Sequence, residues 1–195
     1  MVNVLAALAL HAGSSAAAPS ASLLAGYAFR SAADGRAHGA AASLGVDVPL
    51  FDAQVDALTL RPEGLVMGFG GSATAPTSLA LFAGALSLSY RFDDTDAVAV
   101  AAVGPLGGAV AEGSAVSLRA GVLASLGLRF PVLPALALEA RVGLPLILWG
   151  PQGFALPGAG TFPDGSVNEL PLQSAFTIGV AMDPLALFDD AGSEG

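Results

Sequence analysis

The few charged side chains of this chain are the first candidates for chemistry. Three of its arginines, Arg119, Arg129 and Arg141, lie in the second half of the sequence. The 195 residues include seven basic ones, all arginine, against 16 acidic ones. Arginine and carboxylate groups that are removed from water must pair, because an isolated buried charge carries a large desolvation cost. We therefore predict one ion-pair cluster shielded from bulk water, made of Arg119, Arg129, Glu139, Arg141 and Asp183.

Nucleophilic catalysis would need a nucleophile beside a base. His38 is the only histidine after residue 18, and Ser43 follows it closely. In an extended strand, two residues separated by an odd number of positions point to opposite faces, so these two cannot form a dyad with each other. We predict no catalytic residue and interpret His38 as a histidine at the rim of a strand.

Metal and cofactor sites have no clear signature. The GFGG run at residues 68–71 lacks the glycine spacing and the following helix of a dinucleotide site. The aspartate pairs at 93–94 and 189–190 are of a kind found more often in solvated turns than around Ca²⁺. We expect no metal and no cofactor.

The overall composition excludes several classes of protein. The chain has no cysteine, so disulfides and thiolate metal sites are unavailable, and its net charge of −9 argues against a nucleic-acid partner. It is 54% hydrophobic and only 12% charged, about half the charged share of a soluble domain. Two long uncharged spans, 64–90 and 142–163, are broken by glycine and proline, which argues against membrane helices and favours strands.

Residues 116–130, VSLRAGVLASLGLRF, show how the strands are recognised. Even positions carry Val, Leu, Ala or Phe, whereas the odd positions carry mainly Ser, Arg and Gly. This period of two is typical of a strand whose faces meet different surroundings. The same pattern predicts eight strands, at about 20–33, 37–51, 54–71, 77–92, 96–105, 115–131, 134–149 and 171–188.

The third strand is interrupted by the sequence Arg61-Pro62-Glu63-Gly64, which is read either as a bulge or as a separate tight hairpin. Elsewhere the charges provide a check on the chosen faces, because they were not used to choose them. The charged residues that fall on the small, polar face are Arg30, Asp47, Arg91, Arg119, Arg129, Glu139, Arg141 and Asp183.

Two further regularities concern the ends of the strands. Connections after the second, fourth and sixth strands are short, whereas those after the third, fifth and seventh are longer. Aromatic side chains gather near both ends of the strands, as expected at two membrane interfaces. The predicted aromatic rims comprise Tyr27, Phe29, Phe51, Tyr90, Phe92, Phe130, Trp149 and Phe188.

The apolar face of these strands could line a soluble, lipocalin-like barrel that binds an apolar ligand. Its outer surface would then carry far less charge than a soluble surface does. In the opposite arrangement, the apolar face meets hydrocarbon and the small, polar face fills a narrow lumen. We therefore predict an all-β fold, a closed antiparallel up-and-down transmembrane β-barrel of eight strands.

From Ser20 to Phe188 the sequence resembles the small outer-membrane barrels of Gram-negative bacteria, the OmpA/OmpX-like group, in its alternating strands, loop lengths, aromatic rims and final strand FTIGVAMDPLALF. In that family a terminal aromatic ends the chain and serves recognition by the assembly machinery. Here residues 189–195 follow Phe188 and Pro184 interrupts the strand. The resemblance implies a bacterial outer-membrane location and contact with outer-membrane lipid.

We predict a non-enzymatic barrel with a structural or surface-interaction role and a lumen filled by side chains. Two alternatives are a narrow pore with weak anion preference, suggested by five inward arginines against three acids, and a lipid-modifying enzyme, because such enzymes share this architecture. The long connection 150–169 is the candidate site for an external partner, and the oligomeric state is left open.

The chain is expected to have three parts. Residues 1–18 are interpreted as a signal peptide with an apolar run from Val2 to Leu10, or alternatively as a flexible arm rich in alanine and serine, since no basic residue precedes the run. Residues 19–188 form the β-barrel domain, and residues 189–195 form an acidic tail.

Overall fold

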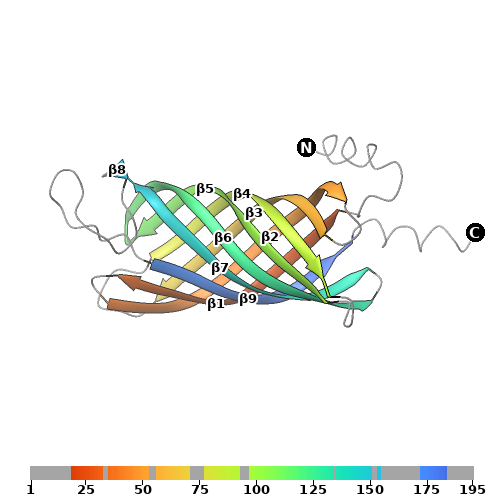
Figure 1. Cartoon of the computed structure of the whole chain (residues 1–195). Coiled ribbons are helices and arrows are strands. Elements are labelled where there is room, and N and C mark those ends of the chain that lie inside the picture. Colours follow the sequence, from red (N-terminus) through yellow and green to blue (C-terminus); the bar gives the residue numbers. More distant parts are fainter. Residues whose placement is uncertain are drawn as a thin grey trace, which may run out of the picture.

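In the part of the chain that the structure describes, nine strands form a single antiparallel sheet that closes on itself (Figure 1). The structure is a computed structural model, and it describes residues 19–32, 35–52, 56–70, 77–92, 97–133, 135–150, 153–154 and 172–183. The strands are β1 (Ser20–Ala32), β2 (Gly35–Asp52), β3 (Asp56–Gly70), β4 (Thr77–Arg91), β5 (Val98–Glu112), β6 (Ala115–Leu133), β7 (Leu136–Gly150), β8 (Gly153–Phe154) and β9 (Leu172–Met182).

Closure is made by the first and last strands. Each long strand pairs with its sequence neighbour up to β7, then β7 pairs with β9 and β9 pairs with β1. The two-residue strand β8 pairs only with the end of β7. The ring is therefore an up-and-down barrel of eight long strands, as predicted, and pairing around the whole ring satisfies the backbone groups that lipid would leave unpaired.

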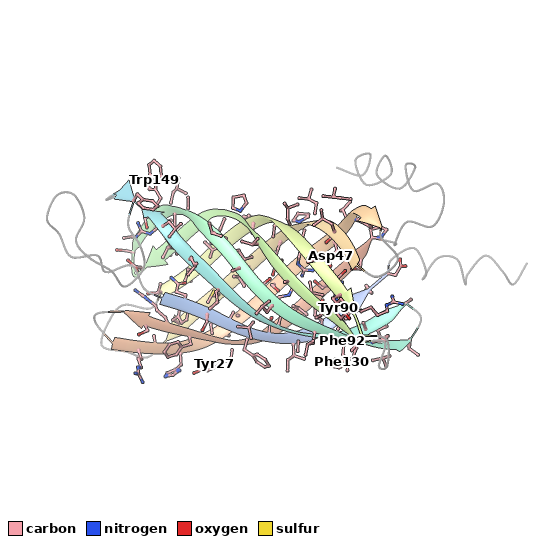
Figure 2. All side chains as sticks on the ribbon, in the orientation of Figure 1. Tyr27, Asp47, Tyr90, Phe92, Phe130 and Trp149 are labelled. Atoms are coloured by element: carbon pink, nitrogen blue, oxygen red, sulfur yellow. The ribbon has the colours of Figure 1, made fainter. Side chains whose placement is uncertain are left out.

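The two faces of the sheet have the predicted orientation. Leu118 and Leu126 expose 78% and 68% of their surface on the outside, whereas Arg141 is only 3% exposed inside the barrel. Figure 2 shows side chains standing out along the whole barrel. The predicted apolar stripe of strands such as β6 therefore lies on the outer surface, and charged residues such as Arg141 face the lumen.

In the part of the chain that the structure describes, no helix is long and apolar enough to cross a membrane.

The connections define two rims. The short-turn rim carries the connections β2–β3, β4–β5 and β6–β7, and the loop rim carries the others. One predicted long connection was wrong: β5 continues to Glu112, and a two-residue turn of Gly113 and Ser114 leads into β6, with Gly113 at φ 59°. The cluster Gly104-Pro105-Leu106-Gly107-Gly108 does not end the strand, because only the two ladder positions of Gly104 and Pro105 are missing on the side of β4, while pairing with β6 continues.

The third long strand is continuous, so neither a bulge nor a hairpin occurs at residues 61–64. Arg61, Pro62 and Glu63 pair in unbroken register with Ala85, Gly84 and Ala83 of β4. Toward β2, the ladder skips the positions of Arg61 and Pro62, of which Pro62 has no N–H to donate, and resumes in the same register. The actual register shift between β2 and β3 lies between Pro49 and Phe51.

The last strand is shorter than predicted, since β9 ends at Met182, and Pro184 follows close behind. The predicted signal peptide at 1–18, the terminal aromatic Phe188 and the acidic tail at 189–195 lie outside the described residues. Most of the predicted partner loop at 150–169 lies outside them as well.

Candidate functional site

Six charged side chains form a closed ring of ion pairs inside the barrel, called the charge ring below. It alternates acid and base all the way round and contains three of each. In order of contact, its members are Asp47 of β2, Arg129 of β6, Glu139 and Arg141 of β7, and Glu63 and Arg61 of β3, which returns to Asp47.

The guanidinium of Arg61 is the most enclosed member, with no exposed surface. Its Nη1 lies 2.8 Å from Asp47 Oδ2, and its Nε lies 2.9 Å from Glu63 Oε2. Its Nη2 donates to Ser22 Oγ at 2.6 Å and lies 4.0 Å from Glu139 Oε1. All of its donor positions therefore face an acceptor, as a buried guanidinium requires.

The other two arginines complete the ring from the opposite wall. Arg129 donates through Nε to Glu139 Oε2 at 2.8 Å and through Nη2 to Asp47. Arg141 donates through Nη1 to Glu63 Oε2 at 3.0 Å and through Nη2 to Glu139. Each acid thus bridges two arginines, and the charges of the ring sum to zero.

The charge ring crosses the lumen rather than following one wall. In the closed sheet, β2 and β3 are separated from β6 and β7 by two strands on either side. Two hydroxyls support Asp47, because Ser20 donates to it at 3.3 Å and Thr59 at 3.5 Å. Figure 2 shows Asp47 in the half of the barrel nearer Tyr90 and Phe130, on the side of the short-turn rim.

Above the charge ring, toward the loop rim, the lumen is filled by apolar side chains. This apolar plug draws on all eight long strands and consists of Ala28, Ala41, Leu65, Met67, Phe69, Leu79, Leu81, Ala83, Leu106, Val110, Leu123, Ile147 and Ala175. Its members are at most 8% exposed. The lumen thus has two layers, a charged one and an apolar one, and both are packed with side chains.

A second polar contact lies at the loop rim. Arg30, near the end of β1, donates to Thr77 Oγ1 at 2.5 Å and lies 3.3 Å from Glu112 at the end of β5. This pair is partly exposed and is separate from the charge ring.

Three of the five residues predicted for the cluster meet in the charge ring, namely Arg129, Glu139 and Arg141. Arg129 and Glu139 are directly opposite each other in the register of β6 and β7. Arg119 does not belong to the ring, because it lies at the other end of β6, beside Gly150 near the loop rim. Asp183 directly follows β9, where its backbone N–H donates to Ala135 O at 3.0 Å.

The sequence prediction lacks half of the charge ring, because it assigns Arg61 and Glu63 to a bulge or a tight hairpin and places Asp47 on the inner face without a partner. A signal for the first two exists in the sequence. Arg61 and Glu63 continue the odd-numbered positions of Thr59 and Leu65, and all four are buried. The proline and the glycine between them occupy outward positions, where they interrupt no inward side chain.

The aromatic side chains lie as follows. Tyr90, Phe92 and Phe130 are exposed at the short-turn rim, and the rings of Tyr90 and Phe92 meet edge to face at 5.2 Å (Figure 2). Trp149 lies at the loop rim, and Tyr27 and Phe29 lie on the outer face of β1. The side chain of Phe51 lies outside the described part.

His38 is outward-facing at the loop end of β2. It is hydrogen-bonded through Nδ1 to the hydroxyl of Tyr27, and its ring lies 5.6 Å from that of Phe29. Ser43 is buried on the lumen side, so the two residues do lie on opposite faces.

No protein-family model matches the sequence. No curated protein is similar to it at a significant level. Among solved structures, in contrast, one shares the fold with a TM-score above 0.5. The crystal structure of neisserial surface protein A (NspA) aligns over 87% of this chain and 99% of its own with a TM-score of 0.58 at 17% sequence identity. Ail, the attachment invasion locus protein of Yersinia pestis, solved in complex with the heparin analogue sucrose octasulfate, covers 85% of this chain and 99% of its own with a TM-score of 0.46 at 11% identity. By its ring of eight long strands and its likeness to NspA, the chain has the fold of the small outer-membrane β-barrels of the OmpA/OmpX-like type.

Proposed function

We propose that this protein resides in a bacterial outer membrane as a non-conducting, non-enzymatic barrel with a structural or surface-interaction role. The observation that carries the proposal is the charge ring, which joins opposite walls of the lumen and carries no net charge. A second layer, the apolar plug, lies above it. A water-filled ion path would have to pass both.

The charge ring also bears on the alternative of an anion-preferring pore. That alternative depended on an excess of inward arginine. In the ring, each of the three arginines has two carboxylate partners, so the ring offers no free cation to a passing anion. The connection 150–169 remains the proposed contact for an external partner, since the chain between β7 and β9 is the longest connection at the loop rim.

The location is tested by separating the membranes of cells that produce the full chain and running the outer-membrane fraction on a detergent gel with and without boiling. A folded barrel resists the detergent until it is heated, so we expect a band in that fraction that shifts on boiling. A cytosolic band without a shift would contradict the membrane location.

The non-conducting assignment is tested on the same protein in planar lipid bilayers. We expect no steady single-channel current. A reproducible current with anion preference would overturn the non-conducting assignment while leaving the location intact. Lipid A that changes in mass when the protein is produced, and does not change with His38→Ala, would overturn the non-enzymatic assignment.

A further inference from the structure

A groove opens at the loop rim where β6 and β7 separate. Pairing between these strands ends at Ala120 and Trp149, next to a register shift. From there β6 continues to Ala115 alongside β5 alone, while β7 turns back into β8. The space between them, called the rim groove below, has a volume of about 540 Å³ and is lined by Val116, Ser117, Leu118, Arg119, Ala120, Trp149 and Gly150.

Arg119 is the cation of the rim groove, and it has no ion-pair partner among the residues that the structure describes. Among the described residues, Arg30, Arg61, Arg129 and Arg141 each have a carboxylate within ion-pair distance, and Arg119 has none. The position of its side chain depends on Gly150: a Cβ added there would lie against Arg119 Nη1 and 3.1 Å from its Cζ. Because residue 150 is a glycine, the guanidinium of Arg119 can occupy this position in the groove wall.

The remaining walls are continuous with the outer surface of the barrel. Val116 and Leu118 are on the outward stripe of β6 and are 70% and 78% exposed. Trp149, 62% exposed, stands on the outer face of β7 near the loop rim (Figure 2). Tryptophan prefers the boundary between hydrocarbon and head groups, so this level of the barrel is where a lipid head group begins. An acyl chain along Val116 and Leu118 would thus place its head group beside Arg119.

We propose that the rim groove binds an anionic membrane lipid with a phosphate head group of net negative charge, whose phosphate pairs with Arg119 while an acyl chain lies against Leu118 and Trp149. The proposal rests on the membrane location proposed above. A guanidinium matches phosphate oxygens with two parallel N–H groups, which makes arginine well suited to this contact. The net charge of −9 gives the protein no general attraction for anions, so a preference for anionic lipid must have a local origin.

The sequence provides a built-in reporter, because Trp149 is the only tryptophan. Brominated acyl chains quench tryptophan fluorescence on contact. The full chain is reconstituted into phosphatidylcholine vesicles that contain a fixed fraction of brominated phosphatidic acid or, in parallel, of brominated phosphatidylcholine. We expect phosphatidic acid to occupy the groove about fivefold more strongly, which corresponds to about 1 kcal/mol for one arginine near the surface.

Three variants test whether the preference comes from this site. Arg119→Gln should abolish it. Gly150→Ala keeps every charge but displaces the guanidinium, so it should lower the preference as well. Arg91→Gln is the matched control, since it removes one exposed arginine at the short-turn rim and should leave the preference unchanged. If Arg119→Gln retained the wild-type preference, or Arg91→Gln lost it, the assignment to Arg119 would be wrong.

A third brominated lipid distinguishes phosphate lipids from other anionic amphiphiles. A brominated fatty acid in the same vesicles carries a carboxylate head and should quench less than phosphatidic acid. Equal quenching would overturn the assignment of a phosphate ligand. The heat-shift gel on the same vesicles separates the two proposals: a shifted band without lipid preference contradicts the rim-groove site alone, and an absent shift contradicts the membrane barrel and the groove together.

Discussion

At the scale of the residue, the charge ring requires a glycine at position 45, because Arg61 lies where a side chain at this position would be. Gly45 faces the lumen from β2, and a Cβ there would lie 2.5 Å from Arg61 Nη2 and 2.7 Å from its Cζ. Arg61 is held by Asp47, Glu63 and Ser22, so its guanidinium cannot move aside without loss of these contacts. Glycine is required here for the close approach of a charged group, at an ordinary backbone conformation.

We expect Gly45→Ala to reduce the free energy of unfolding by about 1–3 kcal/mol, the usual cost of forcing extra volume into a packed interior. The measurement is a urea titration of the barrel in lipid vesicles, with the folded fraction read from the heat-shift gel. Gly68→Ala is the matched control, because a Cβ at Gly68 meets nothing within 4 Å. Its effect should stay within about 0.5 kcal/mol, and equal losses for both variants would contradict the role of Gly45.

At the scale of the element, β6 shows how one strand serves two surroundings. Its even-numbered side chains, such as Leu126, point outward, and its odd-numbered ones supply Leu123 to the apolar plug and Arg129 to the charge ring. Along the strand, the outer stripe passes from the loop rim through the middle of the apolar band to the short-turn rim. The cost of an outward charge should therefore depend on its depth.

Leu126→Arg places a charge near the middle of this band and should cost about 2–4 kcal/mol of unfolding free energy. Val132→Arg, on the same stripe but next to the end of β6, should cost at most about 1 kcal/mol, because its guanidinium can reach the interface. Urea titrations of the two variants in vesicles check the difference. Equal small costs would mean that the outer stripe of β6 does not face hydrocarbon.

The sequence predicts β6 and β7 well for a physical reason. Their outward positions are large and apolar while many inward ones are Ser, Gly, Arg or Glu, so the period of two is visible and Arg129 falls opposite Glu139. In β3 the signal is weaker, because Leu65, Val66 and Met67 are apolar on both faces. The sequence does not identify Arg61 and Glu63 as strand residues for another reason. The proline and the glycine beside them favour a turn locally, whereas the pairing with both neighbouring strands that keeps the segment extended exists only in the closed sheet.

At the scale of the whole molecule, the lumen is divided into a charged layer and an apolar layer. The apolar plug was not predicted, because alternation identifies a face only when the opposite face differs from it. Leu79 and Leu81 stand on the inner face of β4 while Phe82 and Leu86 stand on the outer one. The loop half of the barrel wall is thus apolar on both sides and resembles the interior of a soluble protein in its packing.

Leu81→Ala should leave a cavity in the apolar plug and cost about 2–5 kcal/mol, as large-to-small changes do in packed cores. Leu86→Ala on the outer face of the same strand should cost less, because lipid chains fill the space that the side chain leaves. Unfolding titrations of both variants test this order. Planar-bilayer recordings of Leu81→Ala should still show no current, since the charge ring remains intact.

The balance of the charge ring also determines how the barrel responds to an electric field. A membrane voltage does work only on net charge that moves through it, about 2.3 kcal/mol per elementary charge for each 100 mV. Three guanidinium groups and three carboxylates that shift as a unit carry no gating charge. Potentials across the bilayer therefore exert opposing forces on neighbouring members of the ring, and these forces cancel over the ring as a whole.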